Sequence, residues 1–143
     1  MGPLLFSIYI YINDLPDLCA AEDPDSEIYL YADDSKIYKV IRTRSEQQKL
    51  QPVLHLVKRW SDNWLLRLST EKCKSVSYCI KQQTIDTTYH IIDRNQLHPL
   101  EKVNSMVDLG IRFDNNLTFR EHMSEKIDKA YSCLLYTSDA ADE

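Results

Sequence analysis

The sequence predicts an α+β fold on three observations. Two β-rich runs, at 27–30 and 35–41, flank a short turn and indicate a β-hairpin. Apolar residues then recur at helical spacing between Leu50 and Leu68, which predicts one long amphipathic helix. No internal repeat and no Gly/Ser-rich or Pro-rich linker divides the chain, so we expect a single compact unit.

The start of the long helix is predicted from its polar residues. Ser45 and Gln48 resemble a capping box, with Pro52 as an alternative first-turn residue. Trp60 and Trp64 lie on the apolar face of this helix. We therefore expect both indoles to pack in the core rather than to stack on nucleic-acid bases.

The segments before the first hairpin are less regular. The apolar run 3–12 is either a helix or a buried strand, and 19–26 reads as an exposed loop. The run 3–12 is too short to span a bilayer and lacks the positive flank and cleavage site of a secretory signal. We expect a soluble protein without a membrane partner.

Shorter elements are expected after the long helix. The runs 75–80 and 87–92 predict a second hairpin, and 106–113 predicts a further strand. Residues 114–116 form a turn cluster of Asp and Asn. Apolar spacing over 119–135 predicts a final amphipathic helix.

Composition excludes several classes of function. The only glycines among the 143 residues are Gly2 and Gly110, so phosphate-binding loops of the G-x-G-x-x-G or Walker type are excluded. The formal net charge of −5 argues against a free-standing nucleic-acid binder. The four cysteines form no C-x-x-C pair, so we expect neither a zinc site nor a disulfide: Cys19, Cys73, Cys79 and Cys133.

The motif that points to chemistry is Tyr31-Ala32-Asp33-Asp34, between the first two β-rich runs. Adjacent carboxylates at a rigid hairpin tip can hold Mg²⁺, which binds one or two carboxylates and leaves its other positions to water and phosphates. This arrangement suits nucleotidyl transfer. The alternative is that Asp33 and Asp34 only shape the turn, since Asp is favoured there for its own hydrogen bonds.

Six sequence blocks follow one another in a set order: Gly2-Pro3-Leu4-Leu5-Phe6, Tyr11-Ile12-Asn13-Asp14-Leu15-Pro16, Tyr31-Ala32-Asp33-Asp34, Trp60-x-x-x-Trp64, Lys72 within 68–73, and 109–122. This order resembles the palm of reverse transcriptases encoded by non-LTR retrotransposons of the LINE or jockey type. The resemblance extends to about Leu135. It implies a catalytic β-hairpin, a long helix and further hairpins, followed by the first helix of a thumb.

The resemblance assigns roles around the catalytic hairpin. Asp33 would coordinate the metal ions and Asp34 would support the site, and both are candidate metal and catalytic residues. Tyr31 and Ala32 would lie beside the nucleotide or primer, where the small side chain of Ala32 leaves room. Lys72 matches a lysine near the departing pyrophosphate, with a solvated surface lysine as the alternative.

Five further residues match the same family pattern. Gly2 and Pro3 would mark the edge of the nucleotide pocket. Leu109-Gly110 resembles the strand-turn that grips the primer end, the alternative being a plain buried strand end. His122 falls within the pattern too, although we expect it to be an ordinary, partly exposed helix histidine.

The implied reaction is two-metal phosphoryl transfer with two Mg²⁺ ions, acting on an RNA template, a DNA primer and deoxynucleoside triphosphates. The implied divisions are a partial palm over 1–116, the start of a thumb helix over 117–135 and a foreign tail over 136–143. By the same resemblance, the compartment is intracellular, nuclear or cytoplasmic.

Two considerations limit the expected activity. By the resemblance, the two-metal site requires a third carboxylate from an upstream strand, and no such strand precedes Gly2 in this sequence. The fingers region, which in this family holds template and triphosphate, is missing as well. We therefore expect the isolated chain to be inactive. The rival hypothesis is a non-enzymatic α+β interaction or structural module, and a metal-dependent phosphatase or nuclease would need more convergent acids or histidines.

Overall fold

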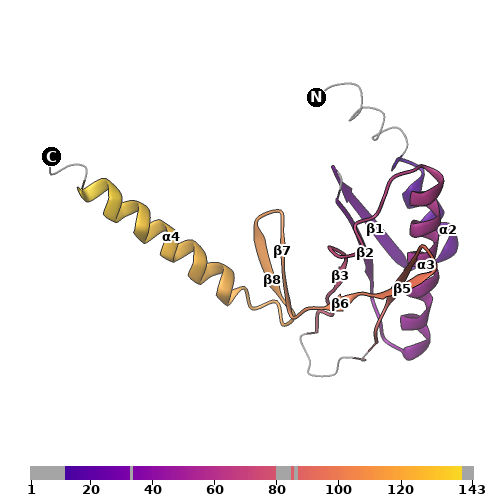
Figure 1. The fold of residues 1–143 in the computed structure, drawn as a ribbon. Helices are drawn as coiled ribbons and strands as arrows, with labels where there is room; N and C mark the ends of the chain where they lie inside the picture. The colour runs from indigo at the N-terminus through magenta and orange to yellow at the C-terminus, as the bar shows by residue number, and fades with distance from the viewer. Residues whose placement is uncertain (1–11, 33, 80–84, 86, 140–143) are drawn as a thin grey trace. The chain divides into compact units, whose positions relative to one another are not determined.

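The computed structural model describes residues 12–32, 34–79, 85 and 87–139, with side chains as far as Leu134. The described chain forms an α+β fold of helices and small two-stranded sheets (Figure 1). It divides into two compact units rather than the single unit expected. Unit 1 comprises the described residues of 1–73 and 85–100, and unit 2 comprises those of 74–84 and 101–143.

Unit 1 contains two antiparallel hairpins and two helices. Its elements are α2 (Leu15–Glu22), β1 (Ser26–Tyr31), β2 (Asp34–Lys39), α3 (Arg44–Asn63), β4 (His90–Asp93) and β5 (Gln96–Pro99). Strand β1 pairs with β2, and β4 pairs with β5. The predicted first hairpin and the long helix are therefore both present.

The core of unit 1 lies between α2, α3 and the inner face of the first hairpin. Its buried members come from the two helices: Leu15, Cys19, Val53, Val57 and Trp60. Half-buried strand residues pack against them, including Ile28, Leu30 and Ile37. A smaller buried cluster joins Tyr89, Ile91 and Leu100 to the other apolar positions of α3.

The prediction of an exposed loop over 19–26 is wrong, because α2 runs to Glu22. Leu15 and Cys19 are four residues apart, so they share one helical face, and both are buried. Pro16 lies in the first turn of α2, where its missing N–H costs no intrahelical bond. The run 3–11 lies outside the described residues.

Helix α3 begins at a different capping box from the predicted one. Thr43 is the N-cap: its Oγ1 accepts from the Glu46 backbone N at 3.2 Å, and Glu46 Oε2 accepts from the Thr43 backbone N at 3.0 Å. Ser45 and Gln48 therefore lie inside the helix, and so does Pro52. The reciprocal pair satisfies two free N–H groups at the helix start.

The predicted core role holds for Trp60 and fails for Trp64. Trp60 is 7% exposed, whereas Trp64 is 42% exposed and follows the last helical residue. The backbone N–H of Leu66 donates to the Ser61 carbonyl at 2.9 Å, and Leu65 has a φ of 58°. This left-handed residue ends the helix directly after Trp64, so no further helical turn follows to cover the indole.

The second hairpin of unit 1 is attached to α3 by polar side chains. Gln51 Nε2 donates to the His90 carbonyl at 2.7 Å, and the His90 backbone N–H donates to Gln51 Oε1 at 3.1 Å. Lys58 Nζ pairs with Asp93 at 2.9 Å. One amide on α3 thus satisfies both backbone groups of a residue in β4.

Unit 2 contains short strands and one long helix. Its elements are β3 (Lys74–Ser75), β6 (Glu101–Lys102), β7 (Ser105–Asp108), β8 (Ile111–Asp114) and α4 (Arg120–Asp139). Strand β3 pairs with β6 in parallel, and β7 pairs with β8 in antiparallel fashion. The predicted pairing of 75–80 with 87–92 is therefore wrong, and residues 80–84 and 86 lie outside the described part. The predicted single strand over 106–113 is interrupted by a turn.

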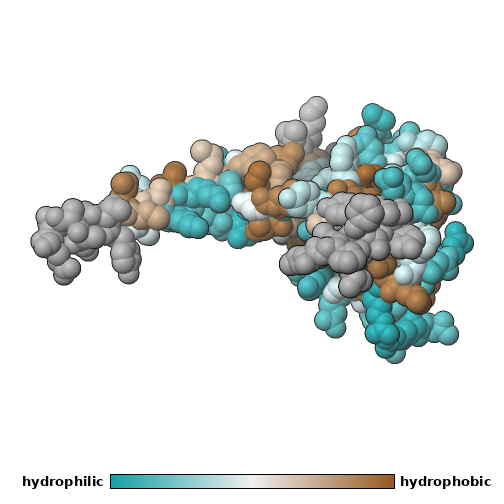
Figure 2. Space-filling model, turned by 90° about the horizontal axis from the view of Figure 1, so that it is seen from above, coloured by the Kyte–Doolittle hydropathy of each residue, from teal (hydrophilic) through white to brown (hydrophobic). Residues whose placement is uncertain are grey.

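Helix α4 confirms the predicted final helix. Its apolar residues at helical spacing are exposed in the described structure: Met123, Ile127, Tyr131 and Leu134. Figure 2 shows hydrophobic as well as hydrophilic surface along α4. Across the described ranges, none of the helices has the length and apolar character needed to cross a membrane.

Candidate functional site

The candidate site is the tip of the β1–β2 hairpin. The strand register pairs Tyr31 with Asp34, so the connecting loop consists of Ala32 and position 33. Ala32 has a φ of 53°, as expected at the first position of the primed turns that close two-residue hairpins. Asp33 lies outside the described residues.

The two faces of this hairpin differ in chemistry. Ile28, Leu30 and Ile37 pack on the core, while the opposite face carries three exposed tyrosines: Tyr29, Tyr31 and Tyr38. The rings of Tyr29 and Tyr38 meet edge to face with centroids 5.4 Å apart. Asp34 is exposed beside Tyr31. The tip therefore presents a carboxylate and aromatic side chains to solvent.

The base of the hairpin is fixed by buried charges that the sequence analysis missed. Lys39, the last residue of β2, forms an ion pair with Asp23, and their side chains are 0% and 4% exposed. Asp23 Oδ2 also accepts from Ser26 Oγ, at the start of β1. Burial raises the pKa of the Asp23 carboxyl, but hydrogen bonds from Lys39 and Ser26 outweigh it and hold the pKa below its usual value.

The other predicted site residues are not part of this hairpin. Lys72 is exposed in a turn of unit 1, where its backbone N–H donates to the Ser69 carbonyl at 3.0 Å. Gly2 and Pro3 lie outside the described residues. Of the predicted residues, the structure brings together Tyr31, Ala32 and Asp34.

Leu109 and Gly110 form the two-residue turn between β7 and β8 in unit 2. Their φ values are 47° and 82°, and the register pairs Asp108 with Ile111. Positive φ at both positions is characteristic of a type I′ turn. The predicted strand-turn is present, and the alternative of a buried strand end does not hold, because Leu109 is exposed.

The junction between β8 and α4 is built from polar residues. The Arg112 backbone N–H donates to His122 Nδ1 at 3.3 Å, and the Arg112 guanidinium pairs with Glu125 at 2.8 Å. Asp114 accepts from the backbone N–H groups of Thr118 and Phe119 at 3.0 and 2.7 Å. These backbone bonds, first that of Thr118, lower the pKa of Asp114. His122 is thus a structural acceptor in this junction.

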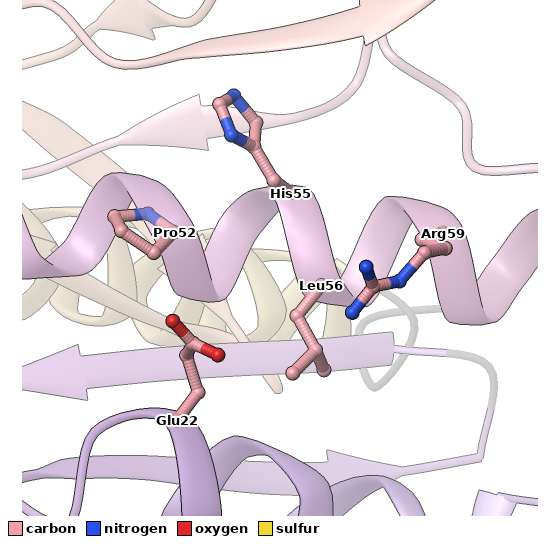
Figure 3. A pocket seen from close by; sticks show the side chains of 5 residues that line it. All are labelled: Glu22, Pro52, His55, Leu56 and Arg59. Carbon is pink, nitrogen blue, oxygen red and sulfur yellow. The ribbon is translucent and has the colours of Figure 1, made fainter.

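A shallow hollow of about 240 Å³ lies between the end of α2 and the middle of α3 (Figure 3). Its lining residues are Glu22, Pro52, His55, Leu56 and Arg59. In Figure 3, Glu22 points from α2 toward α3, and His55 points away from Glu22. None of the predicted site residues lines this hollow.

No group of three or more His, Cys, Asp or Glu side chains gathers at one point among the described residues, which do not include Asp33. The oxygen donors at the hairpin tip nevertheless suit a hard cation. Asp34 is exposed there, and an Asp carboxylate is a ligand that Mg²⁺ prefers.

In sequence, the chain is similar to RNA-directed DNA polymerases of non-LTR retrotransposons. The chain is 26% identical over 131 residues to the RNA-directed DNA polymerase from mobile element jockey of Drosophila melanogaster. It is 24% identical over 128 residues to the probable RNA-directed DNA polymerase from transposon X-element of the same species.

Both matches cover 87% of this chain and 13% of the relative, so the chain spans about one-eighth of the length of these proteins. No protein-family model and no solved structure matches the chain. The predicted resemblance to jockey-type reverse transcriptases is confirmed by the two matches.

Proposed function

We propose that this chain is part of the palm of an RNA-directed DNA polymerase and that its β1–β2 hairpin carries metal-binding carboxylates. The observation that carries the proposal is the hairpin register, which pairs Tyr31 with Asp34 beside the left-handed Ala32 and so puts an exposed carboxylate at the end of the hairpin. Two curated relatives named as RNA-directed DNA polymerases support the assignment.

In the proposed site, Asp33 and Asp34 hold Mg²⁺ through their carboxylate oxygens. When bound, Mg²⁺ supplies positive charge beside the phosphates and favours deprotonation of the attacking hydroxyl. Ala32 keeps the tip small, so that a primer end or nucleotide can approach. Tyr31, exposed beside Asp34, offers an aromatic surface to that nucleotide.

Five residues outside the tip have proposed roles. Lys72 would place its exposed ammonium near the departing pyrophosphate and offset the negative charge that develops there. Leu109-Gly110 would contact the primer end. Its type I′ turn contains a glycine, which allows a ligand to approach the backbone closely. Gly2 and Pro3 would contribute to the nucleotide pocket.

The proposal extends to organisation and partners. Residues 1–116 would belong to the palm, 117–135 to the first thumb helix, and 136–143 to a tail without a function. In the longer polymerase, the partners would be an RNA template, a DNA primer and deoxynucleoside triphosphates, in the nucleus or cytoplasm of the host cell.

Mn²⁺ titration followed by NMR tests the metal site. Mn²⁺ is a paramagnetic substitute for Mg²⁺, so it should broaden the amide resonances of β1 and β2 next to the tip, with a dissociation constant of about 10⁻³ M. The variant Asp33→Asn/Asp34→Asn should lose this broadening. Asp108→Asn, at the corresponding place beside the β7–β8 turn, is the matched control and should keep it. Equal broadening in all three proteins would overturn the proposed metal site.

Primer extension tests the activity of the 143-residue polypeptide. We propose that it is inactive alone, because a two-metal site at this hairpin would need a third carboxylate besides Asp33 and Asp34. An RNA template with an annealed DNA primer, Mg²⁺ and all four triphosphates should give no extended product. Mg²⁺-dependent product that Asp33→Ala abolishes would show that this expectation is wrong.

A further inference from the structure

The hairpin that carries Asp34 has buried charged side chains at the end opposite its turn. Lys39 and Asp23 form an ion pair, and both side chains are at least nine-tenths buried. Lys39 is directly opposite Ser26 in the strand register, and Ser26 donates its hydroxyl to the same Asp23 oxygen. A buried ion pair contributes little net stability because desolvation offsets the attraction, but it can specify one arrangement over its competitors.

The apolar pattern of the hairpin excludes one kind of competing register. Ile28 and Leu30 face the core from β1, and Ile37 faces it from β2. A slip of one residue would turn one strand over and expose its apolar side chains. A slip of two residues keeps all three facing the core, because side chains alternate with a period of two. The apolar residues therefore do not distinguish the observed register from a two-residue slip.

One such slip is sterically reasonable. It would pair Leu30 with Ile37 and Tyr31 with Lys36, leaving the four residues 32–35 as the loop. Four-residue hairpin loops are common. It would also free Ala32 from the positive φ of 53° that it adopts at the first position of the two-residue loop. Asp34 would then leave the strand and lie in the loop.

The buried charges oppose this slip. Two residues along a strand correspond to about 7 Å, so Lys39 would face Ile28 and lose contact with Asp23. Both charges would stay in the core without a partner, which is strongly unfavourable. The ion pair thus distinguishes the two registers that the apolar pattern leaves equivalent.

We propose that Asp23 and Lys39 are positioning residues that fix the register of the β1–β2 hairpin and so hold Asp34 at the start of β2, opposite Tyr31. This inference rests on the proposed function for the role of Asp34. The register itself is measurable without a metal.

The test compares backbone NOEs across the hairpin in variants of the full 143-residue chain. Lys39→Met alone leaves Asp23 buried and unpaired, and that protein is at risk of unfolding. The main variant is therefore Asp23→Asn/Lys39→Met, which removes both charges and keeps an oxygen for Ser26. Lys36→Met, on the same strand and opposite Tyr29, is the matched control. Lys39→Arg keeps the positive charge and tests whether that charge is enough to maintain the register.

The wild type, Lys36→Met and Lys39→Arg should each show one register, with NOEs between Tyr29 and Lys36. The double variant should show a second set of resonances, with Tyr31 opposite Lys36 and the slipped population raised about tenfold or more, the factor that corresponds to 1.4 kcal/mol of lost discrimination. A single, unchanged register in the folded double variant would overturn the inference.

Mn²⁺ broadening separates this inference from the proposed function. If both hold, Mn²⁺ affinity at the tip falls in the double variant in proportion to the slipped population and returns in Lys39→Arg. If the wild type shows no broadening but the double variant slips, the register role stands and the metal site fails. Loss of Mn²⁺ binding without any change of register contradicts the positioning role.

Discussion

The two hairpins that carry predicted site residues, β1–β2 and β7–β8, are closed in the same way and supported differently. Both have two-residue loops with a left-handed first residue, Ala32 and Leu109. The base of the first hairpin is fixed by a buried ion pair, and one face packs on a buried core. The second is joined to α4 by Asp114 and by the partly exposed Arg112–Glu125 pair.

The difference concerns which forces position each tip. The tip of β1–β2 depends on groups that are withdrawn from water, so changes in the core of unit 1 should displace it. The β7–β8 tip depends on hydrogen bonds and ion pairs near solvent, where individual contacts are weaker. We expect core substitutions to act on the first hairpin and polar substitutions to act on the second.

The largest effect is expected from Trp60. Its indole is buried, and Nε1 donates to Asp14 Oδ1 at 3.0 Å. Trp60→Ala should lower the free energy of unfolding of unit 1 by about 3–5 kcal/mol. Urea unfolding followed through the amide resonances of β1 and β2 measures this value. Trp64→Ala is the matched control and should cost less than about 1 kcal/mol, and equal losses would contradict the burial described for Trp60.

Acid should destabilise both hairpins, because each is held by a carboxyl group whose pKa is lowered in the folded chain. Asp23 and Asp114 have lower pKa values in the folded than in the unfolded chain. Their stabilisation is therefore fully present above the unfolded pKa of about 4 and is lost as the pH falls through the folded values. Urea unfolding at several pH values between 7 and 2 should show this loss only below about pH 4.

Two variants show which carboxyl group causes the loss of stability of each hairpin in acid. Asp23→Asn/Lys39→Met should flatten the pH dependence of the β1 and β2 resonances, and Asp114→Asn should flatten that of β7 and β8. If both variants lose as much stability in acid as the wild type, other carboxyl groups are responsible.

A smaller, local effect is expected from Asp114→Ala. The carboxylate accepts from the backbone N–H groups of Asn116, Thr118 and Phe119, and without it these donors lack their side-chain acceptor. Hydrogen exchange of these amides and of the first turn of α4 should become faster, with no change in β1–β2. Ser124→Ala, farther along α4, is a control, and faster exchange throughout unit 1 would contradict a local role.

The sequence predicted the elements whose signals are local. Alternating β-rich runs indicated the first hairpin, and apolar spacing indicated α3 and α4. It missed α2, because the polar residues Asp23-Pro24-Asp25 indicated a loop over 19–26, although Pro16 suits the first turn of a helix. It missed the β4–β5 turn because Arg94 and Asn95 adopt positive φ without a glycine.

The candidate site was predictable only in part, because some of its residues are neighbours in the sequence and others are far apart. Tyr31, Ala32 and Asp34 are neighbours in sequence, so their proximity at one tip followed from the hairpin. Asp23 and Lys39 are 16 residues apart, and their pairing follows from the strand register and the loop after α2. Neither has a distinctive sequence pattern, so the support beneath the tip became visible only in the folded chain.

The smallest effects are expected at the two turns, and they distinguish the hairpins most directly. Leu109→Asn gives the Asn-Gly pair that type I′ turns favour, and it should stabilise β7–β8 by about 1 kcal/mol. Ala32→Gly removes a similar strain and should stabilise β1–β2 by about 0.5 kcal/mol, since glycine adds unfolded-state entropy. Urea unfolding read from each hairpin's own resonances measures both values.

The register argument adds a second expectation for Ala32→Gly. This substitution favours the two-residue loop over the slipped four-residue loop, because the strain that the slip would relieve is gone. Combined with Asp23→Asn/Lys39→Met, it should shift the hairpin back toward the register that pairs Tyr31 with Asp34. Failure to reduce the slipped population would mean that strain at Ala32 does not oppose the observed register.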